Sequence, residues 1–213
     1  MINAVIFDFD GVLVESVDIK TKAFAKLFES EGDSIVQQVV EYHLNNTGVS
    51  RFVKFEYIYK QLLKRELTDE VLNRLCARFS QIVIDDVVNA PYVSGALEFL
   101  KGHLSEYVYF VVSATPQKEM ENIATRRNIR NFFKRIYGSP TSKNDAVRML
   151  LSEENLISSN VLYVGDALSD YEAASANGVK FVARINNNES LFLGNNCLKV
   201  KDFTDIDKLI KGL

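Results

Sequence analysis

Two pairs of aspartates are placed where they could do chemistry. Asp8 and Asp10 directly follow an apolar run at residues 4–7, and Asp166 and Asp170 follow another apolar run further along the chain. Alternate side chains at the end of a strand point to the same side, so Asp8 and Asp10 can face one pocket. Two carboxylates at close range repel each other unless a cation lies between them or one of them holds a proton. This tension suits a nucleophile beside a general acid.

The second pair lies in the segment Gly-Asp-Ala-Leu-Ser-Asp at residues 165–170, between an expected strand and an expected helix. If both strands belong to one parallel sheet, all four carboxylates meet at the same edge and require a divalent metal. A site built from oxygen ligands suits Mg²⁺. Taken singly, Asp166 is better interpreted as a turn residue at the end of a strand. Asp170 is then a carboxylate favoured by the dipole at the start of a helix.

A possible phosphate site lies between the two pairs. Ser113 ends an apolar run and is followed by Ala114, Thr115 and Pro116, where a helix is expected to begin. A hydroxyl and free amides at a helix N-terminus can hold a phosphate oxygen. An equally good local interpretation makes Thr115 a helix cap, with proline in the first turn. Lys143 could neutralise both phosphate and nucleophile, although an isolated lysine in a polar loop is usually solvated.

Strands and helices alternate around these candidate residues. Apolar, β-rich runs predict the strands, and apolar residues at three- and four-residue spacing predict the helices. Strands are expected at 4–7, 107–112, 161–164 and 180–185, with weaker candidates at 135–137 and 198–200, and helices at 95–104, 117–128, 143–151 and 170–177. This alternation predicts an α/β fold with a doubly wound parallel sheet, whose ligands bind outside the carboxyl ends of the strands.

One interval breaks the alternation. From about residue 17 to residue 88 every pattern is helical, and the interval is longer than any ordinary crossover between two parallel strands. We therefore expect a helical cap domain at 17–88, inserted into a core formed by 1–16 and 89–213.

Composition excludes several classes of protein. The net charge is −3 and the basic residues are scattered, which argues against a nucleic-acid partner. The N-terminal apolar run stops at Asp8, too short for a signal peptide or a membrane span. Cys76 and Cys197 lie far apart among apolar neighbours and are expected to be small buried side chains. A cytoplasmic protein without a membrane partner, either a monomer or a weak homodimer, is the expectation.

The order of the motifs resembles that of the haloacid dehalogenase superfamily of phosphotransferases across essentially the whole chain. It most closely resembles the branch with phosphoglycolate phosphatase and β-phosphoglucomutase. The resemblance implies a Rossmann-like core with a helical cap and a magnesium cofactor. It also implies a role for each motif residue: Asp8 as nucleophile, Asp10 as general acid/base, Ser113, Ala114 and Lys143 as phosphoryl-binding residues, and Asp166 and Asp170 as residues that complete a metal site with Asp8 and Asp10.

The implied reaction is two in-line displacements on a small phosphorylated metabolite. Asp8 attacks phosphorus and forms an aspartyl phosphate while Asp10 protonates the departing alkoxide. Asp10 then takes a proton from the water that hydrolyses this intermediate. The dehalogenases of the superfamily lack the second aspartate of the first motif, so Asp10 favours phosphoryl transfer over carbon–halogen cleavage.

The leaving group is expected to meet the cap. The turn at residues 47–51 resembles the loop that contacts the leaving group in the β-phosphoglucomutase branch. Arg51 could grip a carboxylate or a second phosphate bidentately, with Ser50 beside it and Lys54 one turn further. The alternative is that Ser50 caps the next helix and Arg51 is solvated.

Three rival functions remain open. A mutase would hand the phosphoryl group to a second hydroxyl, but the β-phosphoglucomutase pattern has a histidine where this chain has Lys20. A phosphonoacetaldehyde hydrolase would form a Schiff base on a cap lysine, for which Lys20 and Lys54 are available. A non-catalytic sensor of phosphorylated metabolites is the third. His43 and His103 look like ordinary helix residues.

Overall fold

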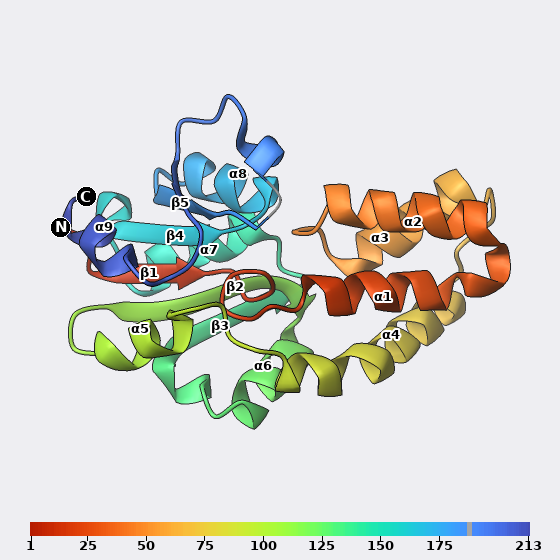
Figure 1. Ribbon diagram of the computed structural model, residues 1–213, viewed down its shortest axis with the longest axis horizontal. Coiled ribbons are helices and arrows are strands. Elements are labelled where there is room, and N and C mark those ends of the chain that lie inside the picture. Colours follow the sequence, from red (N-terminus) through yellow and green to blue (C-terminus); the bar gives the residue numbers. More distant parts are fainter. Residues whose placement is uncertain (187–188) are drawn as a thin grey trace.

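The computed structural model describes residues 1–186 and 189–213, and these contain one six-stranded sheet with every neighbouring pair of strands parallel. The strand order is β3-β2-β1-β4-β5-β6 (Figure 1). This order reverses at β1, as in a Rossmann-like doubly wound sheet. The predicted fold class is confirmed. The strands are β1 Ala4–Phe7, β2 Val108–Pro116, β3 Phe133–Ser139, β4 Val161–Gly165, β5 Lys180–Arg184 and β6 Leu198–Val200.

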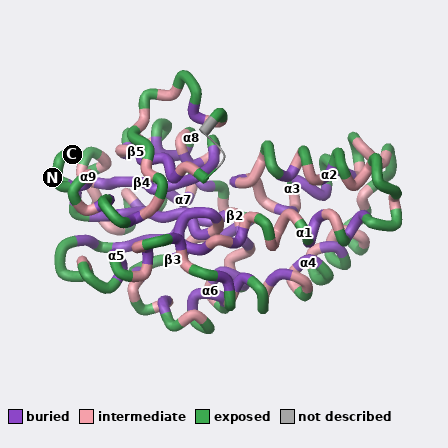
Figure 2. Tube along the Cα trace, viewed as in Figure 1, coloured by how far each residue is buried: buried purple, intermediate pink, exposed green. Residues whose placement is uncertain are grey.

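The sheet is buried on both faces because its central strands are apolar on both. In β1, Val5 and Phe7 belong to one apolar cluster, and Ala4 and Ile6 belong to the other. Buried residues follow the central strands in Figure 2, as expected for parallel strands covered on both sides. Helices α5 (Ala96–Gly102), α6 (Gln117–Arg126) and α9 (Ile206–Lys211) pack on the first face, and α7 (Lys143–Glu153) and α8 (Leu168–Ala176) pack on the second.

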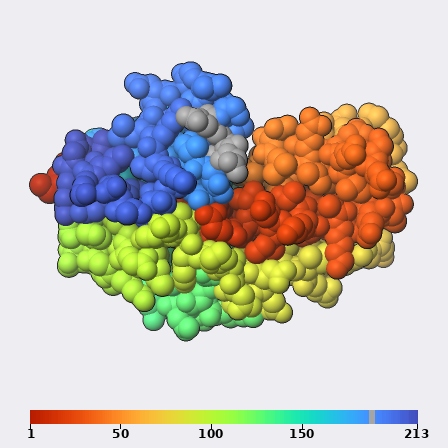
Figure 3. Space-filling view, in the orientation of Figure 1, coloured from red at the N-terminus to blue at the C-terminus, as the bar shows by residue number. Residues whose placement is uncertain are grey.

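Four α-helices between β1 and α5 form a separate lobe (Figures 1 and 3), which we call the cap. Its interior is built on Phe24, Phe55 and Phe79, whose ring centroids lie 4.7 to 6.2 Å apart. The predicted helical insertion is confirmed, and we propose to retain its boundaries at 17 and 88. The cap helices are α1 Val17–Leu27, α2 Asp33–Asn45, α3 Arg51–Tyr57 and α4 Asp69–Asn89, with a 3₁₀ turn at Glu29–Glu31 and a π-helical turn at Ile58–Leu62.

Strand β2 continues four residues past the predicted end at Val112 and includes Ser113 and Thr115. The extension has a physical basis, because Pro116 pairs with Ser139 at the end of β3. Ser113 and Ala114, two of the residues predicted to bind phosphate, therefore lie on a strand of the sheet, shortly before α6.

Two expectations from composition can be compared with the structure. Cys76 and Cys197 are free and half-buried, so the prediction that they are small buried side chains is wrong. Among the residues described, none of the helices has the length and apolar character that a membrane span requires.

Candidate active site

The carboxyl ends of β1 and β4 bring the two aspartate motifs together. Phe7 pairs with Val164 in parallel register, and the Asp8 N–H donates to the Val164 carbonyl at 3.0 Å. Gly11 has φ +76°, and a Cβ at this position would lie 2.3 Å from Asp166 Oδ2. A glycine is therefore needed both for the turn after β1 and for the room that the Asp166 carboxylate occupies.

Three buried carboxylates and one lysine form the centre of the site. Oxygen atoms of Asp8, Asp166 and Asp170 lie within 4.8 Å of one another, and none of these residues is more than 6% exposed. The Lys143 ammonium donates to Asp8 Oδ2 at 2.7 Å and to Asp170 Oδ1 at 2.6 Å. The Tyr163 hydroxyl donates to the same Asp170 oxygen at 2.7 Å. Asp170 therefore holds the lysine that contacts the nucleophile candidate.

The charges in this centre do not balance. Burial raises the pKa of Asp8 to about 6 against the opposing effect of Lys143, and the Asp170 carboxylate adds to the rise. Burial, followed by repulsion from Asp8, raises the pKa of Asp166 well above its ordinary value. Burial alone would lower the pKa of Lys143, but Asp170 and Asp8 outweigh it and raise that pKa, so the ammonium stays charged. One ammonium does not offset three carboxylates.

These residues fit a divalent metal. The donors are carboxylate oxygens, which Mg²⁺ prefers, and a divalent cation would offset the burial and the mutual repulsion that raise the pKa values of Asp8 and Asp166. The structure brings together Asp8, Asp166 and Asp170 of the four predicted ligands. The carboxylate of Asp10 lies outside this group, and its role as a ligand stays a prediction.

Asp10 contacts a different set of side chains. Its Oδ1 atom accepts a hydrogen bond from Ser16 Oγ at 2.6 Å. Its Oδ2 atom accepts from Thr115 Oγ1 at 3.0 Å and from the Lys20 ammonium. Burial would raise the pKa of Asp10, but the Lys20 charge and these hydrogen bonds outweigh burial and hold the pKa below 3.8. The pKa values of Asp8 and Asp10 are thus pushed in opposite directions, as for paired catalytic carboxylates.

The segment from Ser113 to Thr115 lines a cavity together with Asp8 and Asp10. The Thr115 N–H donates to Ser113 Oγ at 3.1 Å, and the Thr115 hydroxyl points to Asp10. Helix α6 has no side-chain cap, so the alternative interpretation of Thr115 as a helix cap is wrong. This segment therefore lies in the same cavity as the nucleophile candidate, and its part in binding phosphate stays a prediction.

The cap supplies the opposite wall of the cavity. Its lining includes Lys20, His43, Thr47, Arg51 and Lys54. Two contacts of Lys20, with Asp10 and with Thr115 Oγ1 at 2.8 Å, join α1 to the core motifs. Lys20, which stands where the β-phosphoglucomutase pattern has histidine, therefore contacts Asp10, the acid/base candidate.

The turn before α3 rests on the start of α8, just after the loop that carries Asp166. Ser169 Oγ donates to the Gly48 carbonyl at 3.1 Å. A Cβ on Gly48 would lie 2.2 Å from Ser169 Oγ and 3.2 Å from Lys143 Nζ. Only a residue without a side chain allows the cap to approach the site this closely.

Lys54 and His43 form a buried pair on the cap side. Lys54 Nζ lies 2.9 Å from His43 Nδ1, and the two residues are 2% and 4% exposed. Burial, followed by the charge of Lys20, lowers the pKa of Lys54. Burial, followed by the charge of Lys54, lowers the pKa of His43 to about 2. His43 is therefore part of the cavity wall, contrary to its interpretation as an ordinary helix residue.

Arg51 is buried, so its interpretation as a solvated residue is wrong. Its guanidinium pairs with Glu119 of α6. Ser50 occupies the N-cap position of α3, but its side chain makes no capping hydrogen bond. Whether Arg51, Lys54 and Ser50 contact substrate stays a prediction.

Two contributors have only weak signals in the sequence. Tyr163 is a hydroxyl-bearing residue inside an apolar strand, and a buried tyrosine hydroxyl generally has a partner. That partner is Asp170. Glu119 resembles any acidic residue in the first turn of a helix, and nothing local indicates Arg51.

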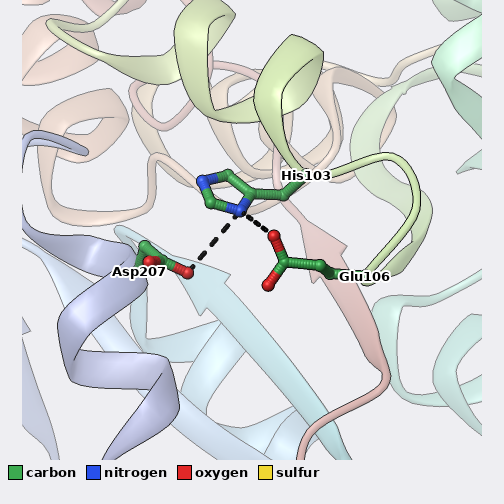
Figure 4. A group of neighbouring side chains, drawn as sticks. All are labelled: His103, Glu106 and Asp207. Carbon is green, nitrogen blue, oxygen red and sulfur yellow. Dashed lines mark hydrogen bonds and ion pairs between the residues drawn. The ribbon is translucent and has the colours of Figure 1, made fainter.

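A second group of possible ligands lies on the surface and is shown in Figure 4. His103 Nδ1 lies 2.7 Å from Glu106 Oε1 and 3.6 Å from Asp207 Oδ1. Lys211 Nζ lies 2.7 Å from Asp207 and 3.6 Å from Glu106. These ion pairs attach α9 to the turn after α5, at the end of the molecule that holds both termini (Figure 1).

Residues 5–184 match the family model for haloacid dehalogenase-like hydrolases. The chain belongs to this family. The resemblance inferred from the order of the motifs is thereby confirmed, as is the prediction of a hydrolase.

Known members of the haloacid dehalogenase-like family align over most of the chain. A phosphorylated carbohydrates phosphatase of Thermotoga maritima is 23% identical over 84% of this chain and 82% of its own length. A phosphoglycolate phosphatase of Aliivibrio fischeri is 25% identical over 83% of this chain and 81% of its own. The crystal structure of a β-phosphoglucomutase from Clostridium difficile superposes with a TM-score of 0.79 at 20% identity, covering 100% of this chain and 98% of the other. At 20% identity, the similarity to this β-phosphoglucomutase structure establishes the fold alone.

In the absence of a divalent metal, titration of Asp8 alone should make the free energy of unfolding about 2 kcal/mol smaller at pH 7.5 than at pH 4.5. The folded-state pKa of Asp8 is about 6 and its ordinary value is 3.8, so the folded chain binds more protons between these values. Stability therefore falls as pH rises through this window. The lowered pKa of Asp10 affects the stability of the fold only below pH 3.8, outside this window. Urea denaturation at both pH values measures the difference.

Asp8→Asn is the control for this stability prediction, because an amide does not titrate in the window. The variant should lose about 2 kcal/mol less than the wild type between the two pH values. Added Mg²⁺ should stabilise the wild type more at pH 7.5 than at pH 4.5. Equal pH dependence in the wild type and Asp8→Asn would contradict the assigned pKa.

Proposed function

We propose that this protein is a Mg²⁺-dependent phosphatase that hydrolyses a small phosphorylated metabolite through an aspartyl phosphate on Asp8. One observation carries the proposal. Asp8 and Asp10 follow the same strand but have separate partners: Lys143 contacts Asp8, and Lys20 and Thr115 contact Asp10. A nucleophile and an acid/base need such different environments at close range.

In the first step, an Asp8 oxygen bonds to phosphorus as the bond to the leaving oxygen breaks. Asp10 gives its proton to that oxygen, and the phosphoryl dianion favours the protonated form of Asp10 by repulsion. In the second step, Asp10 takes a proton from a water that attacks phosphorus and releases Asp8. The low pKa of Asp10 in the free protein suits a group that returns to its ionised form.

Lys143 and the segment Ser113-Ala114 hold the phosphoryl oxygens in this proposal. Lys143 stays charged because two carboxylates contact it. Asp8, Asp166 and Asp170, with Asp10 as the fourth proposed ligand, would hold the metal, which when bound would supply positive charge to the phosphoryl group.

The substrate is proposed to be a sugar phosphate or a phosphoglycolate-like ester. The relatives named above act on phosphorylated carbohydrates and on phosphoglycolate. Discrimination among such esters is assigned to the cap wall, with Arg51, Lys54 and Ser50 as the candidates. Phosphate release should be measured over sugar phosphates, phosphoglycolate and nucleotides with Mg²⁺, with Asp8→Asn as the blank. Absence of release from every ester would overturn the proposal.

Chelation should remove activity and Mg²⁺ should restore it. Asp166→Ala should raise the Mg²⁺ concentration for half-maximal rate by at least about tenfold, because one carboxylate of the cluster is lost. Glu172→Ala, an exposed carboxylate on α8, is the matched control and should leave that concentration unchanged. Full activity in excess chelator would show that the acidic cluster binds no catalytic metal.

Gly48→Ala should lower kcat/KM at least about tenfold by holding the cap away from the core. The added methyl group would meet Ser169 Oγ at 2.2 Å in the closed arrangement. Once the cap opens the methyl group is free, so the urea midpoint should change little. Combining it with Ser169→Gly removes the shortest contact, although the methyl group would still lie 2.6 Å from the Ala167 Cβ, and should recover part of the rate. Wild-type kcat/KM in Gly48→Ala would mean that this approach is unimportant.

A second candidate, carbon–phosphorus hydrolysis, is favoured by one specific observation: Lys54 is buried in the cavity wall with a lowered pKa. An uncharged amine can condense with the aldehyde of phosphonoacetaldehyde and release water. Borohydride should then reduce the imine and fix the two-carbon unit on Lys54, as read by mass spectrometry. Without such labelling, phosphomonoester hydrolysis is the remaining proposal.

A further inference from the structure

Three N–H donors of the Arg51 guanidinium make hydrogen bonds within the protein. Its Nη2 atom donates to Glu119 Oε1 at 2.5 Å, and its Nη1 atom donates to Glu119 Oε2 at 3.0 Å. Nη1 also donates to Ser80 Oγ at 2.8 Å, and Ser80 in turn donates to Glu119 at 2.6 Å. The guanidinium lies 4.4 Å from the centre of the Phe79 ring. Arg51 thus has a bidentate partner, a hydroxyl and an aromatic face.

The pair lies where the cap meets the core. Arg51 begins α3 of the cap and lines the cavity, whereas Glu119 is in the first turn of α6, closely following the Ser113–Thr115 segment. Their side chains are 4% and 7% exposed. A carboxylate of the core is therefore already paired with the arginine that an anionic leaving group would need.

The two other basic residues that the cap contributes to the cavity wall, Lys20 and Lys54, also have partners within the protein. Lys20 pairs with Asp10. Lys54 has no carboxylate within ion-pair distance among the described residues, and its nearest partners are His43 Nδ1 and the Thr47 carbonyl. Arg51 with Glu119 forms a neutral pair, and Lys54 with His43 forms a pair of hydrogen-bonding groups at which burial disfavours charge. Such a wall suits hydroxyl groups.

We propose that Glu119 determines specificity: it occupies Arg51 and excludes substrates whose leaving group carries a second anion, so that the preferred substrate is a phosphomonoester of a neutral polyol. This inference rests on the proposed phosphatase function and narrows it. An incoming carboxylate or phosphate would place two anions on one guanidinium or leave Glu119 buried without its partner. The proposal also changes the role expected for Arg51 from the sequence, which was to bind a carboxylate or a second phosphate of the leaving group.

The test compares phosphoglycolate with 2-hydroxyethyl phosphate, which share a two-carbon skeleton and differ in having a carboxylate or a hydroxymethyl group. Glu119→Gln keeps the shape of the side chain and removes its charge. Arg51 is then left without an anionic partner and can bind the anion of a substrate. The ratio of kcat/KM for phosphoglycolate to that for 2-hydroxyethyl phosphate should rise at least tenfold. Glu121→Gln, on the same helix and paired with Arg130, is the matched control and should leave the ratio unchanged.

A second variant keeps the proposal testable if Glu119→Gln folds poorly. Arg51→Gln combined with Glu119→Gln removes both charges together and should keep the wild-type ratio. A fall in that ratio would show that Arg51 recognises the anion in the wild type and would overturn the proposal. A ratio within twofold of wild type in folded, active Glu119→Gln would also overturn it.

Calorimetry in the Asp8→Asn background separates this inference from the proposed function. The variant should bind both esters without turning them over, and adding Glu119→Gln should favour phosphoglycolate by the same tenfold. That shift in binding, with no phosphate release by the wild type, would overturn the phosphatase proposal alone. Phosphate release by the wild type with no shift in binding would overturn the role of Glu119 alone.

Discussion

Asp8→Asn should reduce phosphate release by at least about 10⁴-fold, on the scale seen when a covalent nucleophile is removed. The amide has nearly the shape of the carboxylate, and its oxygen can keep the 2.6 Å hydrogen bond from the Phe9 N–H. It carries no charge with which to attack phosphorus. The rate is best measured in single turnover, so that product release does not mask the chemical step.

The fold of Asp8→Asn should be intact, because the substitution removes a carboxylate whose burial raises its pKa. At pH 7.5 without metal the variant should therefore be more stable than the wild type. Wild-type protein quenched in acid during turnover should carry one phosphoryl group on Asp8, and the variant should carry none. Residual activity within tenfold of wild type would exclude the covalent mechanism.

The core of the site could be predicted because it depends on local signals. An apolar run ending in Asp-x-Asp-Gly specifies a buried strand and a carboxylate at its end. Parallel pairing then places Asp8 beside the end of β4, with Phe7 in register with Val164. In such a sheet the carboxyl ends of neighbouring strands meet at one edge. The convergence of Asp8 and Asp166 follows from topology and needs no detail of side-chain packing.

The cap side of the site could not be predicted in the same way. Arg51 and Glu119 are 68 residues apart, and their pairing depends on how the cap comes to lie against α6. Locally, Arg51 resembles a solvated residue at a helix start, and Glu119 resembles a carboxylate favoured by a helix dipole. The contact of Lys20 with Asp10 depends likewise on the direction of α1 as it leaves the core. Such contacts are set by the docking of two lobes, for which the sequence has no periodic pattern.

Asp10→Asn should slow hydrolysis of alkyl phosphates by about 10²–10⁴-fold, the usual contribution of a general acid or base. The amide oxygen of asparagine can still accept the hydrogen bond from Ser16, and its NH2 group can donate to Thr115 Oγ1, so the segment should keep its place. It cannot protonate an alkoxide or take a proton from water. Asp18→Asn, the same change at an exposed position of α1, is the matched control and should retain wild-type rates.

The choice of leaving group separates the two duties of Asp10. p-Nitrophenolate leaves without a proton, so Asp10→Asn should still form the aspartyl phosphate from p-nitrophenyl phosphate. Hydrolysis of that intermediate needs the base and should stay slow. The variant should therefore release a burst of p-nitrophenol close to one equivalent of enzyme, followed by slow turnover, whereas an alkyl phosphate should give no burst. If both esters were slowed equally and without a burst, Asp10 would be needed for formation of the intermediate even with a good leaving group. Its place would then be in binding the phosphoryl group or the metal, and the acid/base assignment would be wrong.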